Sequence, residues 1–175
     1  HVVDKATKLQ TIFDRIEMVE TRYEVFKRDA KIKALEKVIA SRQSVDAPAE
    51  SAAMAAFEAE ELALNAEFEF LRHSNTGGEA MKLEDQDRVR DIAQTRLWRN
   101  RLNVVKPGLS DNEVENLTIK AGTLTAMERQ EINHHIVATI KMLEALPWPR
   151  HLTKVPEFAG GHHERMDGKG YPRGI

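Results

Sequence analysis

The chain has 175 residues, with 26 lysines and arginines, 28 aspartates and glutamates, and a formal net charge of −2. This length suits one domain, or a small domain with an elongated appendage. The slightly acidic balance argues against nucleic-acid binding, and the absence of cysteine excludes disulfides, thiolate zinc fingers and cysteine nucleophiles. The sequence contains neither an apolar run near the ~20 residues that cross a bilayer nor a recognisable signal peptide. We therefore expect a cytoplasmic protein without membrane insertion.

A long first helix is predicted over residues 8–43. Its apolar residues follow one another at alternating steps of four and three, which places them on one stripe of a helix. These residues are Ile12, Ile16, Val19, Tyr23, Phe26 and Ala30. A proline and small residues at 44–50 interrupt this pattern.

Two further helices are predicted at about 50–73 and 82–100. The first is rich in alanine and glutamate, and the paired glycines of the segment 74–80 end it. One side of it carries Phe57, Leu64, Phe68 and Leu71. Successive amphipathic helices of this length indicate an antiparallel hairpin or a coiled-coil-like arm, and a plain helical bundle is an equal alternative.

The last third of the chain predicts shorter helices. The segment 99–122 is irregular, although Ser110 and Glu113 are placed to cap a short helix. Thr125 and Glu128 have the spacing of a capping box, and the helix that they begin ends at the prolines of 146–149. A last helix is expected at about 151–163. Because no segment alternates as a strand does, the sequence predicts an all-α fold.

Five of the seven histidines lie between positions 134 and 163. His135 is on the helix that Thr125 begins, and His162 and His163 are at the end of the next helix, which turns back after the prolines. If the two helices pack side by side, these imidazoles can converge. Adjacent helical residues point about 100° apart, so a histidine pair suits two neighbouring metal ions or a chain that splays at the helix end.

The histidines are candidate metal ligands. Neutral imidazole suits iron, manganese, nickel or zinc, and two metal ions about 3.5–4 Å apart are a common device for phosphoester hydrolysis. On the residues alone, a chance surface pair is an equal alternative. We expect His134 to be a solvated neighbour, and His73 and His151 to lie at helix ends.

The segment "DGKGYP" (167–172) predicts a rigid turn. Gly168 and Gly170 permit positive φ angles, and Asp167 can accept a hydrogen bond within the turn. Such a turn would hold Tyr171 in a rigid, projecting loop.

Residues 122–175 resemble the HD-GYP family of metal-dependent phosphohydrolases, which are the cyclic-di-GMP phosphodiesterases of bacterial signalling. The family's defining stretch is "HHE" followed by "DGxGYP", and its "LTxxER…H" helix lies upstream at the same spacing. The resemblance implies that His135, His162 and His163 bind part of a cluster of two or three divalent metal ions. It implies a role for the turn in shaping the substrate pocket and in docking diguanylate cyclase (GGDEF) domains. The residues of that turn are Gly170, Tyr171 and Pro172, with Arg173 near the substrate.

The chain also departs from the family pattern. Residues 1–9 resemble the stretch that follows the family's His-Asp doublet, so the resemblance places that doublet before His1 and a further aspartate ligand after Ile175. In most members this stretch runs almost directly into the "LTxxE" helix, whereas here residues 10–120 intervene. We therefore predict a partial HD-domain-like core (1–9 and 121–175) with a long antiparallel helical hairpin insertion (10–120), in a piece of a longer polypeptide.

Two functions follow from the resemblance. The first is a bacterial phosphodiesterase that hydrolyses cyclic di-GMP by metal-activated hydroxide, with this chain alone inactive. The second is a degenerate HD-GYP signalling or interaction module, in which the arm mediates dimerisation or relays a signal without catalysis.

For the arm itself, we favour packing of the first apolar stripe against the helix at 50–73 over pairing with a second chain. A homodimer through the arm is kept as an addition.

Overall fold

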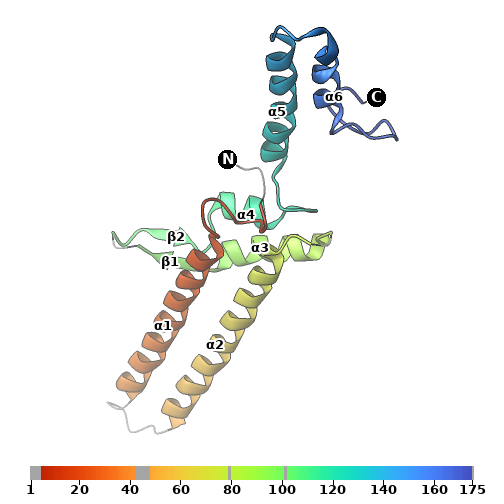
Figure 1. Ribbon diagram of the computed structural model, residues 1–175. Coiled ribbons are helices and arrows are strands. Elements are labelled where there is room, and N and C mark those ends of the chain that lie inside the picture. Colours follow the sequence, from red (N-terminus) through yellow and green to blue (C-terminus); the bar gives the residue numbers. More distant parts are fainter. Residues whose placement is uncertain (1–4, 42–47, 79, 101, 175) are drawn as a thin grey trace. The chain divides into compact units, whose positions relative to one another are not determined.

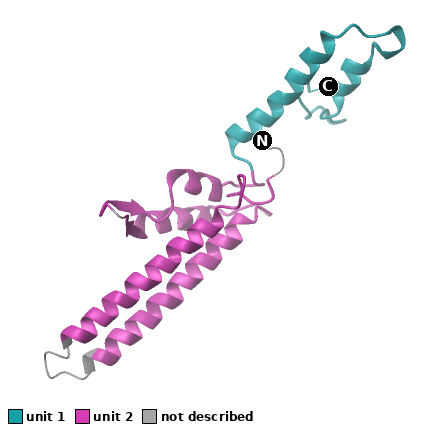
Figure 2. Ribbon diagram, turned by 60° about the vertical axis from the view of Figure 1, so that its left-hand side comes forward, with its two compact units in different colours: residues 1–4, 124–175 teal, residues 5–123 magenta. Residues whose placement is uncertain are grey.

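The computed structural model has an all-α fold and describes residues 5–41, 48–78, 80–100 and 102–174 (Figure 1). It is 63% helical. The chain forms two compact units, one of residues 5–123 and one that contains residues 124–174 (Figure 2). Among the described residues, none of the helices combines the length and the apolar character needed to span a bilayer.

The elements of the first unit are four α-helices and a small sheet. They are α1 (Ile16–Ser41), α2 (Pro48–Asn75), α3 (Leu83–Thr95), β1 (Leu97–Arg99), β2 (Val105–Pro107) and α4 (Asp111–Leu117). The second unit contains α5 (Ala126–Glu144), the 3-10 helix η1 (Arg150–Leu152) and α6 (Val155–Gly161). The capping boxes predicted at Ser110–Glu113 and Thr125–Glu128 are both present, and they begin α4 and α5.

The helices α1 and α2 lie side by side as a hairpin (Figures 1 and 2). Val19 and Tyr23 of α1 are buried against Leu64 and Leu71 of α2. The ring of Tyr23 meets that of Phe26 edge-on, with 5.5 Å between the centroids. The expected packing of the stripe against α2 is therefore confirmed for Val19, Tyr23 and Phe26, which hairpin formation removes from water.

The predicted start of the first helix was wrong. Helix α1 begins at Ile16, not at residue 8, and Ile12 is fully exposed. The Asp14 carboxylate accepts the backbone N–H of Ile16 at 3.0 Å, which satisfies a free donor at the helix end. Before it, the chain turns so that Leu9 is fully buried and its backbone N–H donates to Asn75 Oδ1 at 2.7 Å.

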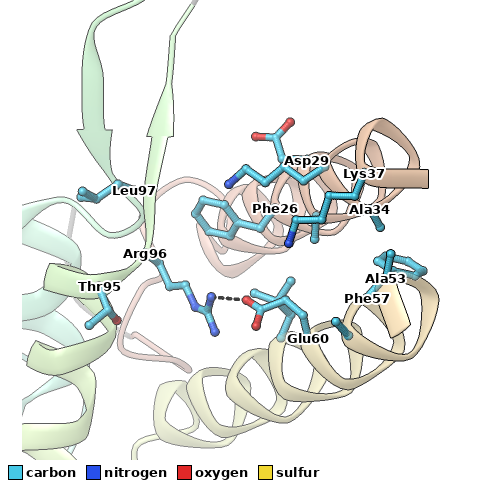
Figure 3. A pocket seen from close by; sticks show the side chains of 14 residues that line it. Phe26, Asp29, Ala34, Lys37, Ala53, Phe57, Glu60, Thr95, Arg96 and Leu97 are labelled. Atoms are coloured by element: carbon cyan, nitrogen blue, oxygen red, sulfur yellow. Dashed lines mark hydrogen bonds and ion pairs between the residues drawn. The ribbon is translucent and has the colours of Figure 1, made fainter. Parts of the chain in front are cut away.

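Two partly buried arginines join the α1–α2 hairpin to the rest of its unit. Arg96, just after α3, donates to both oxygens of Glu67 at 2.7 and 2.8 Å and to Glu60 at 2.6 Å. Figure 3 shows Arg96 reaching Glu60 beside a pocket of about 320 Å³ between α1 and α2. Arg22 of α1 contacts Glu113 of α4 at 2.5 Å. These ion pairs fix the base of the hairpin against α3 and α4.

The predicted helix at 82–100 was too long, and the expectation of no strands was wrong at one place. Helix α3 ends at Thr95, and β1 pairs antiparallel with β2, with Leu97 opposite Pro107. The connection is a turn in which Asn103 has a φ of 60° and donates to the carbonyl of Asn100 at 2.8 Å. Asparagine tolerates this left-handed conformation better than most residues. With three residues each, the strands are too short to produce a visible alternation.

The first unit begins and ends at neighbouring points. Thr123 Oγ1 donates to the carbonyl of Lys5 at 2.7 Å, and Lys5 Nζ donates to Asn116 Oδ1 at 2.7 Å. Lys8 Nζ donates to the carbonyl of Leu117 at 3.1 Å, and burial lowers the pKa of this lysine. An inserted segment must leave and rejoin its host domain at adjacent positions. The geometry meets that requirement, and the division into core and insertion stays a prediction.

Candidate metal centre

The helices α5 and α6 pack on each other and carry the three candidate histidines. Ile136 and Ile140 form the buried face of α5. A Cβ at Gly160 of α6 would lie 3.0 Å from the Ile140 side chain, so the glycine permits a close approach of the two helices. This approach places the C-terminal end of α6 beside the part of α5 that carries His135.

The expected last helix is divided in two. Residues 150–152 form η1, and α6 covers only Val155–Gly161, with Pro156 in its first turn. His162 is the C-cap of α6, so His162 and His163 lie where the helix ends. The chain therefore splays at the pair, and two adjacent side chains can turn toward one region instead of pointing 100° apart.

The three imidazoles converge. The ring centroids of His162 and His163 are 4.0 Å apart, and that of His135 is 5.3 Å from His163 and 6.5 Å from His162. One ring nitrogen from each residue lies within 4.8 Å of the others. His135 and His162 are exposed and His163 is half-buried, so the group is open to ions from solvent.

Hydrogen bonds fix which nitrogen is free in two of the rings. His162 Nδ1 donates to the carbonyl of Ala159 at 2.6 Å, and His135 Nδ1 is paired in the same way with the carbonyl of Ile132. A carbonyl only accepts, so each Nδ1 carries the proton and each Nε2 keeps its lone pair. This is the arrangement by which metal-binding histidines are oriented.

The third ring is biased toward its neutral form. Partial desolvation is the first cause that lowers the pKa of His163, and the charges of His162 and His135 add to it. A neutral imidazole is the form that binds a metal ion.

The donor set fits a divalent metal ion. Two imidazole nitrogens that each lie ~2.1 Å from one ion are at most about 4.2 Å apart. A pair of ions about 3.5–4 Å apart accommodates wider spacing. The observed limit of 4.8 Å between donor atoms is slightly wider than the spacing around one ion and suits the wider spacing around a pair of ions. Imidazole alone does not choose among iron, manganese, nickel and zinc.

The turn after the histidine pair covers one side of this group. Tyr171 stacks on His163, with 4.7 Å between the centroids and 13° between the planes. The backbone N–H of Tyr171 donates to the carbonyl of His163 at 3.2 Å. Within the turn, the predicted acceptor role of Asp167 is confirmed, because its carboxylate accepts from Lys169 N at 3.1 Å. The turn thus presents Tyr171 to the candidate metal centre.

The two glycines of the turn serve different needs. Gly168 has a φ of +69°, as predicted. Gly170 does not have a positive φ, and that expectation was wrong. Glycine is required at position 170 for another reason, because a Cβ there would lie 2.4 Å from Glu164 Cα.

The remaining candidates lie around the turn. Pro172 lines a surface pocket of about 480 Å³ together with Tyr171 and His134. Arg173 is half-exposed, and its guanidinium lies 3.9 Å from Glu144. His134, His73 and His151 are exposed and do not belong to the three-histidine group.

One residue of the site was missed at the level of sequence. The Glu164 carboxylate accepts backbone N–H groups from Arg173 at 2.7 Å and from Gly174 at 3.0 Å. The available signal was an acid directly after the histidine pair and shortly before a glycine-rich turn, where free backbone donors need an acceptor.

Comparison with known proteins finds a family model that matches part of the chain. Residues 108–175 match the HD domain. The match supports a metal-dependent phosphohydrolase of the HD type, and HD domains generally bind divalent metal ions. No curated protein and no solved structure matches the chain.

Proposed function

We propose that this HD-type segment belongs to an HD-GYP phosphodiesterase that hydrolyses the phosphodiester bonds of cyclic di-GMP. The observation that supports it most is the convergence of His135, His162 and His163 within 4.8 Å, two of them with Nε2 free. Among HD-type families, the sequence "HHE" followed by "DGxGYP" resembles that of the HD-GYP family. The cyclic dinucleotide is the substrate class that the resemblance implies.

In this proposal the three histidines hold part of a cluster of two or three divalent ions. When bound, such ions neutralise phosphate charge and supply a hydroxide near neutral pH. The chain's own contribution is orientation. The carbonyls of Ile132 and Ala159 hold the rings of His135 and His162 and leave their Nε2 atoms unprotonated.

The turn would contact the substrate. Tyr171 offers an aromatic face and an adjoining pocket of about 480 Å³, which suits a nucleobase. The guanidinium of Arg173 suits a phosphate. The exposed Pro172 and Arg173 also provide a surface for the proposed docking of diguanylate cyclase domains. A homodimer through the α1–α2 hairpin is a further proposal.

The test uses the polypeptide encoded by the whole gene. We expect the purified protein to contain iron, manganese, nickel or zinc by elemental analysis and to hydrolyse cyclic di-GMP. His162→Ala should lower metal content and abolish hydrolysis. The matched control is His151→Ala, which removes an exposed histidine outside the group. Retained metal and hydrolysis in His162→Ala would refute the ligand assignment. Bound metal without hydrolysis in the unaltered protein would favour the degenerate interaction module.

A further inference from the structure

The turn of residues 164–174 is closed at its two ends by one carboxylate. Glu164 Oε1 accepts the N–H of Arg173 at 2.7 Å, and Glu164 Oε2 accepts the N–H of Gly174 at 3.0 Å. Charged acceptors form the stronger class of hydrogen bond. The chain therefore leaves the histidine pair, makes the turn, and is held at its return by the residue that began it.

Inside the closed turn, the backbone at Gly170 leaves no room for a side chain. The backbone of Gly170 passes so near Glu164 that a Cβ would lie 2.4 Å from the Cα of Glu164. The next residue, Tyr171, donates its backbone N–H to the carbonyl of His163 at 3.2 Å. These two contacts fix the position of the Tyr171 Cα. The ring of Tyr171 then stacks on that of His163, with 4.7 Å between the centroids.

We infer that Glu164 is a positioning residue, whose carboxylate closes the turn and thereby holds the ring of Tyr171 against the imidazole of His163. Without the carboxylate, the N–H groups of Arg173 and Gly174 turn to water, and the C-terminal end of the turn loses two of the hydrogen bonds that close it. The backbone of Tyr171 is then less firmly positioned, its ring no longer stays stacked on His163, and the imidazole of His163 can rotate.

The consequence for metal binding rests on the proposed function, whereas the stacking is a property of the metal-free protein. A ligand whose ring is already held loses less rotational freedom on binding an ion. We expect loss of the stack to weaken metal binding about two- to tenfold, the effect of one aromatic pair.

The experiment compares Glu164→Ala and Glu164→Gln with the unaltered chain. Glu157→Ala is the matched control, because it removes an exposed glutamate of the neighbouring α6. The first readout is the NMR chemical shift of the His163 ring protons in metal-free protein, which the stacked Tyr171 ring displaces upfield. The second readout is Co²⁺ affinity by titration. Far-UV circular dichroism checks that the helices are retained.

We expect Glu164→Ala to lose the upfield shift, Glu164→Gln to lose part of it because one acceptor oxygen remains, and Glu157→Ala to keep it. A retained shift in a helical Glu164→Ala protein would overturn the inference. Should Glu164→Ala lose its helices, Glu164→Gln decides, and an unchanged shift there overturns the inference. If the unaltered polypeptide encoded by the whole gene binds no Co²⁺, the proposed function fails, while the NMR result still decides the role of Glu164.

Discussion

The phenol ring of Tyr171 lies almost parallel to the imidazole of His163, with 13° between the planes and 4.7 Å between the centroids. One face of this candidate ligand is thus covered by an aromatic ring, while His135 and His162 approach from other directions. An imidazole in this setting is both partly shielded from water and close to two groups of like charge. Its protonation should therefore differ from that of a solvated histidine.

We predict that His163 titrates below the ordinary histidine pKa of about 6.5 in metal-free protein. Desolvation lowers its pKa first, and the charges of His162 and His135 lower it further. His162→Gln removes one repulsive charge, so the pKa of His163 should rise toward its ordinary value. Because protons compete with metal ions, metal affinity should fall as the pH drops through this pKa.

An NMR pH titration of the ring protons measures each pKa directly. The exposed His73, in the other compact unit, supplies the control, since His73→Gln should leave His163 unchanged. A pKa of His163 at or above 6.5 in the unaltered chain would contradict this prediction.

A second prediction concerns the arginine that joins the hairpin to α3. Arg96→Ala leaves the partly buried carboxylate of Glu67 without the guanidinium that contacts both of its oxygens. We expect the free energy of unfolding of the first unit to fall by about 1–3 kcal/mol. Urea unfolding followed by Trp98 fluorescence in a Trp148→Phe background measures it, because Trp98 then reports on that unit.

The matched control for this prediction is Arg72→Ala. Arg72 pairs with Glu69 on the surface of α2, where the side chains are 63% and 59% exposed. Exposed pairs of this kind contribute between nothing and about 1 kcal/mol. Equal losses in the two variants would show that the Arg96 contacts do not fix the base of the hairpin.

The third prediction is a pH dependence of stability that comes from Glu113. Burial acts to raise the pKa of Glu113, but hydrogen bonds from Arg22 and Ser110 outweigh it, and the pKa lies below its ordinary value. A carboxyl whose pKa is lower in the folded state stabilises the fold above its unfolded pKa, near 4.3. That contribution is lost as the pH falls through the folded pKa.

Urea unfolding of the first unit at several pH values between about 3 and 7 tests this dependence. Glu113→Gln should be less stable than the unaltered chain at neutral pH, and its stability should change less as the pH falls through that interval. Asp87→Asn is the control, since Asp87 pairs with Arg90 on the exposed surface of α3. Parallel pH profiles for Glu113→Gln and the unaltered chain would contradict the prediction.

Local signals in the sequence were sufficient where local physics decides the structure. The caps at Ser110 and Thr125 depend on residues three positions apart, and both were found. The packing of Tyr23 and Phe26 follows from periodicity alone. The convergence of the histidines needed only one further inference, that the chain turns back after the prolines of 146–149.

The errors arose where distant contacts decide. The apolar spacing continues back to Ile12, but the chain before Ile16 is held by Asn75, which is far away in the sequence. The strands β1 and β2 are stabilised by each other, not by a pattern within either one. The role of Glu164 was missed because its partners are backbone N–H groups, which every residue except proline offers, so its position before the turn is only a weak signal.

The last prediction tests the close approach of backbone to backbone inside the turn. In Gly170→Ala, the new Cβ would meet both Glu164 Cα and Arg165 N at 2.4 Å, so the turn must move. We expect the upfield shift of the His163 ring protons to be lost and Co²⁺ binding to weaken, although Glu164 is still present. Gly161→Ala is the control: a Cβ there meets nothing within 4 Å, and alanine in a helix is favoured over glycine by about 1 kcal/mol. That variant should keep the shift and unfold at a temperature no lower than the unaltered chain. If Gly170→Ala keeps both the shift and the affinity, the position of Tyr171 does not depend on how tightly the turn is closed.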